Sequence, residues 1–185
     1  MSNFYISDMH FGHKNCIAFD NRPFTSVEEM DAAMIANWNQ AVSSGDTVYI
    51  LGDMCWGKQS RAIEIMQQLN GDKVLIKGNH DKLTNVEYAK QFIQVADYLE
   101  VEDADKHIVL CHYPITCFKN QYYGWAHFYG HVHTGFQYNM VENFRYQVEA
   151  LYDKKCVMVN VGAMMQYIGY TPRTAEYIFE HTNNL

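Results

Sequence analysis

The chain is poor in basic residues. Its 185 residues include 14 lysines and arginines against 21 aspartates and glutamates, which gives a formal net charge of -7. Non-specific binding to duplex nucleic acid depends on lysine and arginine side chains that neutralise phosphates. The composition therefore argues against a duplex-binding protein.

Cysteines with disulfide or zinc-finger spacing are also missing. The chain has five cysteines, an odd number, and none of them forms a C-x-x-C pair. We therefore expect neither a disulfide framework nor a thiolate zinc site, and a reducing compartment fits best.

Long apolar runs and a leader-like N-terminus are lacking as well. No apolar stretch approaches the ~20 residues that a membrane span needs. The first residues have no basic-then-apolar pattern and candidate ligands begin at Asp8, so we expect no cleaved leader and a cytoplasmic protein. The length predicts one domain, residues 1–185, that buries roughly 70% of its unfolded surface.

Five short polar motifs stand out, and each follows a stretch with the composition of a β-strand. They are Asp8-Met-His10, Gly52-Asp53, Gly78-Asn79-His80-Asp81, His112 and Gly130-His131-Val132-His133. Strand ends are the usual location of functional groups in an α/β sheet. Carboxylate, imidazole and carboxamide groups together are the ligands that hard-to-borderline divalent metals prefer. The motifs therefore predict a metal site.

The remaining pattern predicts an α/β fold. Helices are expected at 27–41, where Ser26 and Glu29 form a capping box, and at 60–69, 86–94 and 174–180. Strands are expected at 3–6, 47–51, 74–77, 98–101, 107–111, 125–129 and 156–161. The first half alternates strand and helix, which implies parallel βαβ units, and the second half is rich in strands. Residues 135–154 have no clear period, and we expect an irregular or partly stranded segment there.

The five motifs, in this order, resemble the calcineurin-like metallophosphoesterase superfamily. Further stretches resemble its small bacterial and phage members: S-D-x-H-F-G-H, N-R-P-F, L-G-D, I-K-G-N-H-D and H-Y-P. The resemblance extends from the first strand to Asn160-Val161-Gly162. It implies two packed mixed β-sheets flanked by helices, with the site on the strand-end loops, and a metal-dependent phosphoric ester hydrolase.

The resemblance also implies a site with two divalent ions. Mn²⁺ is favoured, and Fe, Zn or Ni remain open because nitrogen and oxygen ligands do not settle the metal. A metal-bridging hydroxide would attack the phosphorus in line, and His80 would stabilise charge or protonate the leaving oxygen. Asp53 would bridge the ions. The remaining ligands would be Asp8, His10 and His133 for one ion, and Asn79, His112 and His131 for the other.

One departure from the motifs of this superfamily narrows the range of expected activities. Protein serine/threonine phosphatases of this superfamily carry G-D-x-x-D-R-G, in which the acid pairs with the catalytic histidine and the arginine grips phosphate. Here Trp56 and Gly57 occupy those two positions. A phosphoprotein phosphatase is therefore disfavoured, and the group that orients His80 is not predicted, although Asp81 is its neighbour in sequence.

Several alternatives remain open at this stage. We predict phosphodiester hydrolysis of a small molecule or nucleotide, and the alternatives are a phosphomonoesterase and a non-catalytic protein-binding scaffold. A homodimer is possible. Tyr122, Tyr123 and Trp125 could stack a nucleobase, although core packing is the better expectation. Lys14 and Arg22 could contact phosphate but are expected to be solvated, His13 is undecided, and structural or surface roles are expected for three other histidines: His107, His127 and His181.

Overall fold

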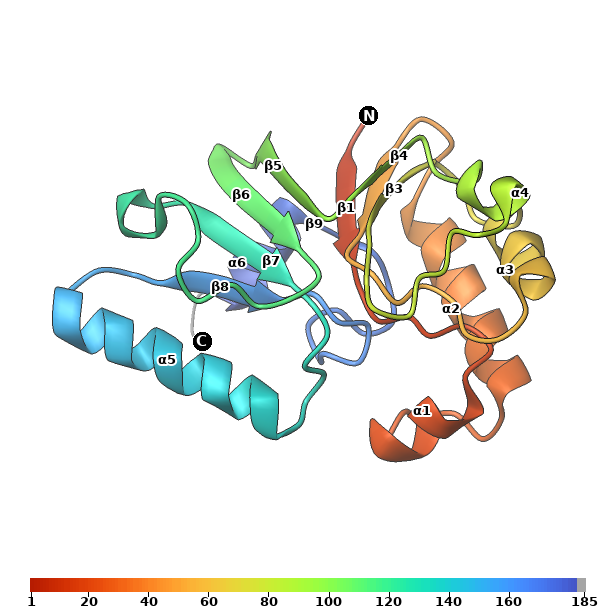
Figure 1. The fold of residues 1–185 in the computed structure, drawn as a ribbon, viewed down its shortest axis with the longest axis horizontal. Coiled ribbons are helices and arrows are strands. Elements are labelled where there is room, and N and C mark those ends of the chain that lie inside the picture. Colours follow the sequence, from red (N-terminus) through yellow and green to blue (C-terminus); the bar gives the residue numbers. More distant parts are fainter. Residues whose placement is uncertain (183–185) are drawn as a thin grey trace.

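The computed structural model describes residues 1–182, so the last three positions of the expected domain lie outside the described residues. Two sheets form its centre (Figure 1). The first has the order β4-β3-β2-β1-β9, in which β1 to β4 are parallel and β9 is antiparallel to β1. Its strands are β1 (Asn3–Ile6), β2 (Thr47–Ile50), β3 (Asp72–Ile76), β4 (Gln94–Ala96) and β9 (Arg173–Thr174).

The second sheet has the order β5-β6-β7-β8, in which β6, β7 and β8 are parallel and β5 is antiparallel to β6. Both sheets are therefore mixed, as the sequence predicted. The four strands are β5 (Tyr98–Asp103), β6 (Lys106–Cys111), β7 (Ala126–Tyr129) and β8 (Val157–Asn160).

Helices flank the two sheets. Figure 1 shows α2, α3 and α4 on the outer side of the first sheet and α5 running along the second. The helices are α1 (Lys14–Phe19), α2 (Val27–Ala41), α3 (Gln59–Met66), α4 (Val86–Ala89), α5 (Phe136–Tyr152) and α6 (Ala175–Thr182), with a short 3₁₀ turn, η1 (Gln121–Tyr123). In the described part of the chain, no helix is both long and apolar enough to cross a membrane.

The sheets pack against each other through a shared apolar core. The ring of Tyr5 on β1 meets the edge of Phe128 on β7, with 5.2 Å between the ring centroids, and both side chains are buried. A parallel bridge between Ser7 and Gly162 joins the segments that follow β1 and β8. This packing brings the carboxyl ends of strands from both sheets to one region of the molecule.

The helix after the first predicted cap forms as expected. The Ser26 hydroxyl accepts a hydrogen bond from the Glu29 amide, which caps α2. The Glu29 carboxylate accepts from the amide and hydroxyl of Thr25, one residue earlier than a capping box requires. Met30 and Trp38 are fully buried on the inner face of α2.

The expectation of an irregular segment at 135–154 is wrong, because Phe136–Tyr152 forms the 17-residue helix α5. Its buried positions, Val141, Arg145 and Val148, have helical spacing. Arg145 interrupts the apolar stripe in the sequence, yet it is buried because Glu142 and Glu149 lie on the same helix face and pair with its guanidinium. The charged residues of this intrahelical ion pair thus interrupt the apolar pattern that would have indicated a helix in the sequence.

The helix expected at 86–94 is also shorter than predicted. It ends at Ala89, and Gln94–Ala96 instead pairs in parallel with β3 as the edge strand β4. Val86 and Ile93, two apolar residues of the expected helix, are 65% and 64% exposed. Backbone pairing to an open sheet edge therefore outweighed a weak local helical pattern.

Candidate metal centre

All five motifs lie where parallel strands end. Asp8 and His10 follow β1, Asp53 follows β2, and Asn79 and His80 follow β3. His112 follows β6 and His131 follows β7. Backbone hydrogen bonds hold the loops together: the amide of Asp8 donates to the carbonyl of Gly52, and that of His10 donates to the carbonyl of Asp53. The structure thus brings all eight predicted site residues into one cluster.

One half of the cluster is built from Asp8, His10 and His133. The two imidazole Nε2 atoms face each other at 3.4 Å, and His133 Nε2 lies 3.7 Å from Asp8 Oδ1. The three residues offer ligand atoms that all lie within 4.8 Å of one another, a spacing that fits one metal ion. Asp8 and His10 are buried, and His133 is partly exposed.

The other half contains a carboxamide. Asn79 Oδ1 lies 3.1 Å from His112 Nε2 and 3.0 Å from His131 Nδ1. His112 is fixed by its second nitrogen, because Nδ1 lies 2.7 Å from the Leu51 carbonyl oxygen and donates to it. Its Nε2 is therefore the atom with a lone pair turned into the site.

Asp53 lies between the two halves. Its Oδ2 atom is 3.8 Å from His10 Nε2 and 3.7 Å from His112 Nε2. The side chain is 3% exposed, and its Oδ1 accepts from the backbone amide of His80. A carboxylate in this position can be shared by ions on both sides.

His80 lies at the open edge of the cluster. Its side chain is 41% exposed, and its Nε2 is 4.0 Å from Asp53 Oδ2. The indole of Trp56 meets the His80 ring edge-on at 4.6 Å between centroids. Asp81 does not orient that ring: its carboxylate accepts from the amides of Asp53, Met54 and Gly78 and so joins two of the loops.

Most of the predicted ligands have a left-handed backbone. Five of them have φ between 46° and 70°: Asp8, His10, Asp53, His131 and His133. This conformation is unfavourable for residues with a Cβ atom, although Asp and His tolerate it better than most. The short loops turn sharply here, and the turn aims successive side chains into one space.

The glycines of three motifs are required by close approach. A Cβ atom on Gly52 would overlap His112 Nδ1, one on Gly78 would overlap Asp53 Oδ1, and one on Gly130 would overlap Asp8 Oδ2 and Ser7 Oγ. In each of the three motifs, the absence of a side chain on glycine therefore makes room for a predicted ligand from another motif.

Gly130→Ala is expected to displace Asp8 and to weaken divalent-ion binding. Overpacking of this kind costs about 1–3 kcal/mol of unfolding free energy, which thermal unfolding and metal titration would measure. Gly45→Ala is the control, because nothing lies within 4 Å of its Cβ position. Equal metal affinity in the Gly130→Ala and wild-type proteins would contradict the close-packing argument.

Two residues that the sequence analysis did not place behind the metal site support His133. The Asp20 carboxylate accepts from His133 Nδ1 at 2.7 Å and pairs with the guanidinium of Arg22 at 2.9 Å. Arg22 also donates to the carbonyls of Asp8 and Met9. The expectation that Arg22 is solvated is wrong, since it is 4% exposed. The only sequence signal was an acid and an arginine two positions apart in a short loop.

Asp20→Asn is expected to weaken metal binding about 10- to 100-fold, the usual effect of removing the partner of a ligating histidine. The substitution also leaves Arg22 buried without its counter-charge, which costs about 3–5 kcal/mol. Metal titration and thermal unfolding separate the two effects. Asp31→Asn is the matched control, because Asp31 is also buried and bonds the Gly12 amide instead of a histidine. Wild-type affinity in Asp20→Asn would exclude this supporting role.

The protonation states of two predicted ligands, His10 and His131, suit a cation. Burial lowers the pKa of His10 to about 2 and lowers the pKa of His131, so both rings are neutral, the form that binds metal. Burial also lowers the pKa of His133, but the Asp20 hydrogen bond and the Asp8 charge outweigh it and raise the pKa overall. Burial raises the pKa of Asp8, which shows how poorly its charge is compensated by protein groups alone. The donor set therefore fits divalent metal ions.

The other histidines named in the sequence analysis, with the exception of His13, and the aromatic residues considered for base stacking lie apart from the predicted ligands. His127 is buried and accepts from the Ile115 amide, as a structural histidine would. His107 stacks on Trp125, and His181 stacks on Tyr177. Tyr122, Tyr123 and Trp125 precede β7, at the end of that strand opposite to His131, so they form no platform at the site.

His13 does lie at the site. Its ring stacks on Trp56 at 4.1 Å between centroids with a 10° interplanar angle, and it lies 5.5 Å from the His10 ring. Lys14 at the start of α1 is exposed. Cys111, at the end of β6 and adjacent to His112, is buried.

Comparisons with known proteins agree with this architecture. An uncharacterised protein of Methanocaldococcus jannaschii is 39% identical over 132 residues, which are 70% of this chain and 68% of that protein. The gene 66 protein of Mycobacterium phage L5 is 41% identical over 85 residues, 44% of this chain and 41% of its own length. A crystal structure of a protein of unknown function from Aquifex aeolicus has a TM-score of 0.70 and 25% identity, and the match covers 97% of this chain and 98% of that one.

The family comparison covers nearly the whole chain. Residues 1–184 match the calcineurin-like phosphoesterase superfamily domain. The two mixed sheets flanked by helices and the cluster of aspartates and histidines are consistent with that match. The chain belongs to the calcineurin-like phosphoesterase superfamily.

Proposed function

We propose that the protein is a binuclear metal-dependent phosphoesterase that hydrolyses a small phosphodiester, such as a nucleotide diester. The observation that carries the proposal is the position of Asp53, whose Oδ2 lies within 4.0 Å of His10, His80 and His112. Burying a carboxylate is costly unless its charge is compensated, and a cation bound between the imidazoles of three loops would compensate it.

The proposed ligand sets follow the two halves of the cluster. Asp8, His10 and His133 would hold one ion, Asn79, His112 and His131 the other, and Asp53 both. Bound divalent ions, Mn²⁺ by preference, supply Lewis-acid activation of water and neutralise phosphoryl oxygens. Asn79 contributes an oxygen without a charge, so the two aspartates leave the loaded site positive and attractive to phosphate.

His80 is the proposed catalytic residue. The amide bond to Asp53 Oδ1 fixes its backbone, while its ring is free to face a substrate. From this position the ring can donate a hydrogen bond to the phosphoryl group or a proton to the leaving oxygen.

Neither position 57 nor Arg22 offers a free guanidinium to a phosphate, which favours a diester over a monoester. Gly57 stands where related phosphatases carry the phosphate-gripping arginine, and the Arg22 guanidinium is directed to Asp20 and to backbone carbonyls. A monoester dianion carries one more negative charge than a diester at neutral pH and would need such a group more.

The same proposal extends to the setting of the reaction. All five cysteines are free, which fits a reducing compartment and a cytoplasmic protein. A small phosphoester or nucleotide is the proposed partner, and duplex nucleic acid is not.

Hydrolysis of bis-p-nitrophenyl phosphate and p-nitrophenyl phosphate tests the proposal. Metal-stripped protein would be resupplied with Mn²⁺, Ni²⁺, Zn²⁺, Fe²⁺ or Mg²⁺, and bound metal would be counted in parallel. We expect Mn²⁺ to restore turnover, with the diester faster. Faster monoester turnover would make the protein a phosphomonoesterase. Two bound ions with no turnover of either ester would favour the non-catalytic scaffold.

A further inference from the structure

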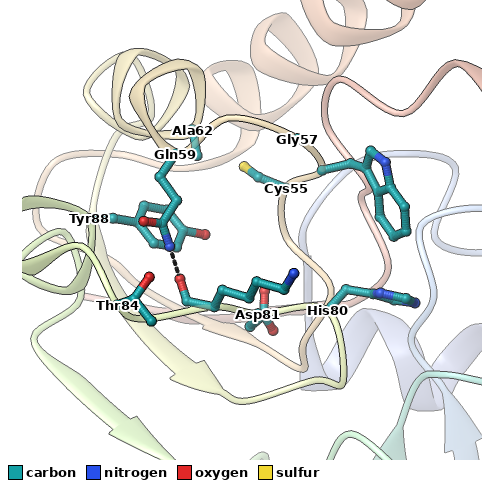
Figure 2. A pocket seen from close by; sticks show the side chains of 10 residues that line it. Cys55, Gly57, Gln59, Ala62, His80, Asp81, Thr84 and Tyr88 are labelled. Atoms are coloured by element: carbon teal, nitrogen blue, oxygen red, sulfur yellow. Dashed lines mark hydrogen bonds between the residues drawn. The ribbon is translucent and has the colours of Figure 1, made fainter.

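A cavity of about 440 Å³ adjoins the metal centre on the His80 side. This volume falls within the ~300–1,000 Å³ of small-molecule sites. Its walls come from the loop after β2, the start of α3, the loop after β3, and α4. Figure 2 shows His80 and Tyr88 at opposite sides of the space, with Gln59, Ala62 and Thr84 near Tyr88.

The cavity communicates with the proposed reaction centre through His80. The ring of His80 lines the cavity and also lies 4.0 Å from the carboxylate oxygen at the middle of the cluster. Trp56, which meets the His80 ring, lines the same wall and is 40% exposed. A group esterified to a phosphoryl unit at the cluster, on the side of His80, would therefore project into this cavity.

We propose that this cavity binds the leaving group of the ester and that the leaving group is a planar, polar alcohol of nucleoside size. The inference rests on the proposed phosphoesterase function, because it places the leaving oxygen beside His80. It assigns a recognition site to residues outside the metal centre, chiefly Trp56, Gln59, Thr84 and Tyr88.

The lining determines the class of ligand. The exposed part of the Trp56 indole supplies flat apolar area, which suits a planar ring, and the largely buried Tyr88 closes the opposite end of the cavity. Gln59, Lys82 and Thr84 supply hydrogen-bonding groups around it, and few such groups are needed to fix an orientation. Gln59 already donates to the Lys82 carbonyl and so links α3 to the loop after β3 (Figure 2).

The acidic group in the cavity does not oppose such a ligand. The Asp81 carboxylate accepts hydrogen bonds from three backbone amides, so most of its acceptor capacity is used. Lys82 is exposed beside it. A neutral, polar ring system is therefore better matched to this wall than a cationic one.

Binding of adenosine and uridine to the Mn²⁺-loaded protein tests the inference, because neither contains an ester to hydrolyse. We expect millimolar or tighter binding by calorimetry, with shifts of the Ala62 and Thr84 methyl resonances in NMR spectra. Thr84→Trp should reduce the affinity at least tenfold by filling the cavity. Gln59→Trp, on the α3 side, should do the same and guards against misfolding of the first variant.

Ser60→Trp is the control, because Ser60 is an exposed neighbour on α3 that does not line the cavity. It should bind the nucleosides and hydrolyse model esters as the wild type does. Failure of both nucleosides to bind, or equal affinity in Thr84→Trp and Gln59→Trp, would overturn the cavity assignment. Nucleoside binding that the two variants abolish, in a protein that hydrolyses no ester, would support the cavity while overturning the proposed function.

Discussion

Asp53→Asn is expected to abolish binding of both divalent ions and to reduce ester hydrolysis to background. Asp53 Oδ2 lies 3.8 Å from His10 Nε2 and 3.7 Å from His112 Nε2, so both proposed ions lose the ligand that they share. Asparagine keeps the shape and can still accept the His80 amide hydrogen bond. The change therefore removes the charge with little disturbance of the loops.

Thermal unfolding gives a readout that is independent of turnover. A ligand at a free concentration 100 times its dissociation constant stabilises the protein that binds it by about 2.7 kcal/mol. Addition of Mn²⁺ should therefore raise the unfolding temperature of the wild-type protein and leave that of Asp53→Asn unchanged. Asp97→Asn serves as the control, because Asp97 is 78% exposed and pairs with Lys77 at the surface. Full turnover with two ions retained in Asp53→Asn would exclude Asp53 as the shared ligand.

His80→Ala is expected to leave both ions bound and to lower turnover by roughly 10²- to 10⁴-fold, the usual loss for a general acid or transition-state donor. The imidazole is the only part removed, since the bond from the residue 80 amide to Asp53 Oδ1 belongs to the backbone. Steady-state kinetics and metal analysis on the same samples would measure both quantities.

His181→Ala is the matched control for that variant. His181 is an exposed histidine on α6, stacked on Tyr177 and hydrogen-bonded to its carbonyl, so its removal should change neither metal content nor turnover. Loss of an ion from the His80→Ala protein would instead make His80 a ligand and the proposed division of the cluster incorrect.

The candidate site could be predicted because its residues stand at the ends of apolar strands. The sequence analysis named Asp53 and His112 for that reason, and the structure brings them to within 3.7 Å. Asp20 and Arg22 could not be found in this way. They follow a short helix, and only the folding of that loop against His133 shows that the pair is buried behind the site.

The expectation that Tyr122 and Tyr123 pack in the core is also wrong, since they are 40% and 82% exposed. Tyr122 and Tyr123 drew attention as neighbours in sequence, but strand β7 separates them from His131. Trp56 was noted only as a departure from the phosphatase pattern, yet it contacts both His13 and His80. Contact between loops that follow different strands is a tertiary property, and a local pattern does not contain it.

The helices and strands were predicted most accurately where the local sequence had a clear strand composition or a clear helical period. The β-branched strands around Val48 and Leu75 and the Ser26-capped helix were placed within a few residues. The failures were α5, where the buried Arg145 is neutralised by glutamates of its own helix, and β4, whose pairing depends on the neighbouring strand. In both cases the deciding interaction was polar.

The left-handed backbone at five of the seven predicted ligands has an evolutionary consequence. Each such residue costs of order 1 kcal/mol relative to glycine, and a domain of this size has only about 5–15 kcal/mol of net stability. Asp8, His10, Asp53, His131 and His133 are all in this conformation. A lineage freed from selection for ion binding would gain stability by drifting to glycine or asparagine at these positions. Glycine at any of these five positions is therefore expected to stabilise the metal-free protein while removing a predicted ligand.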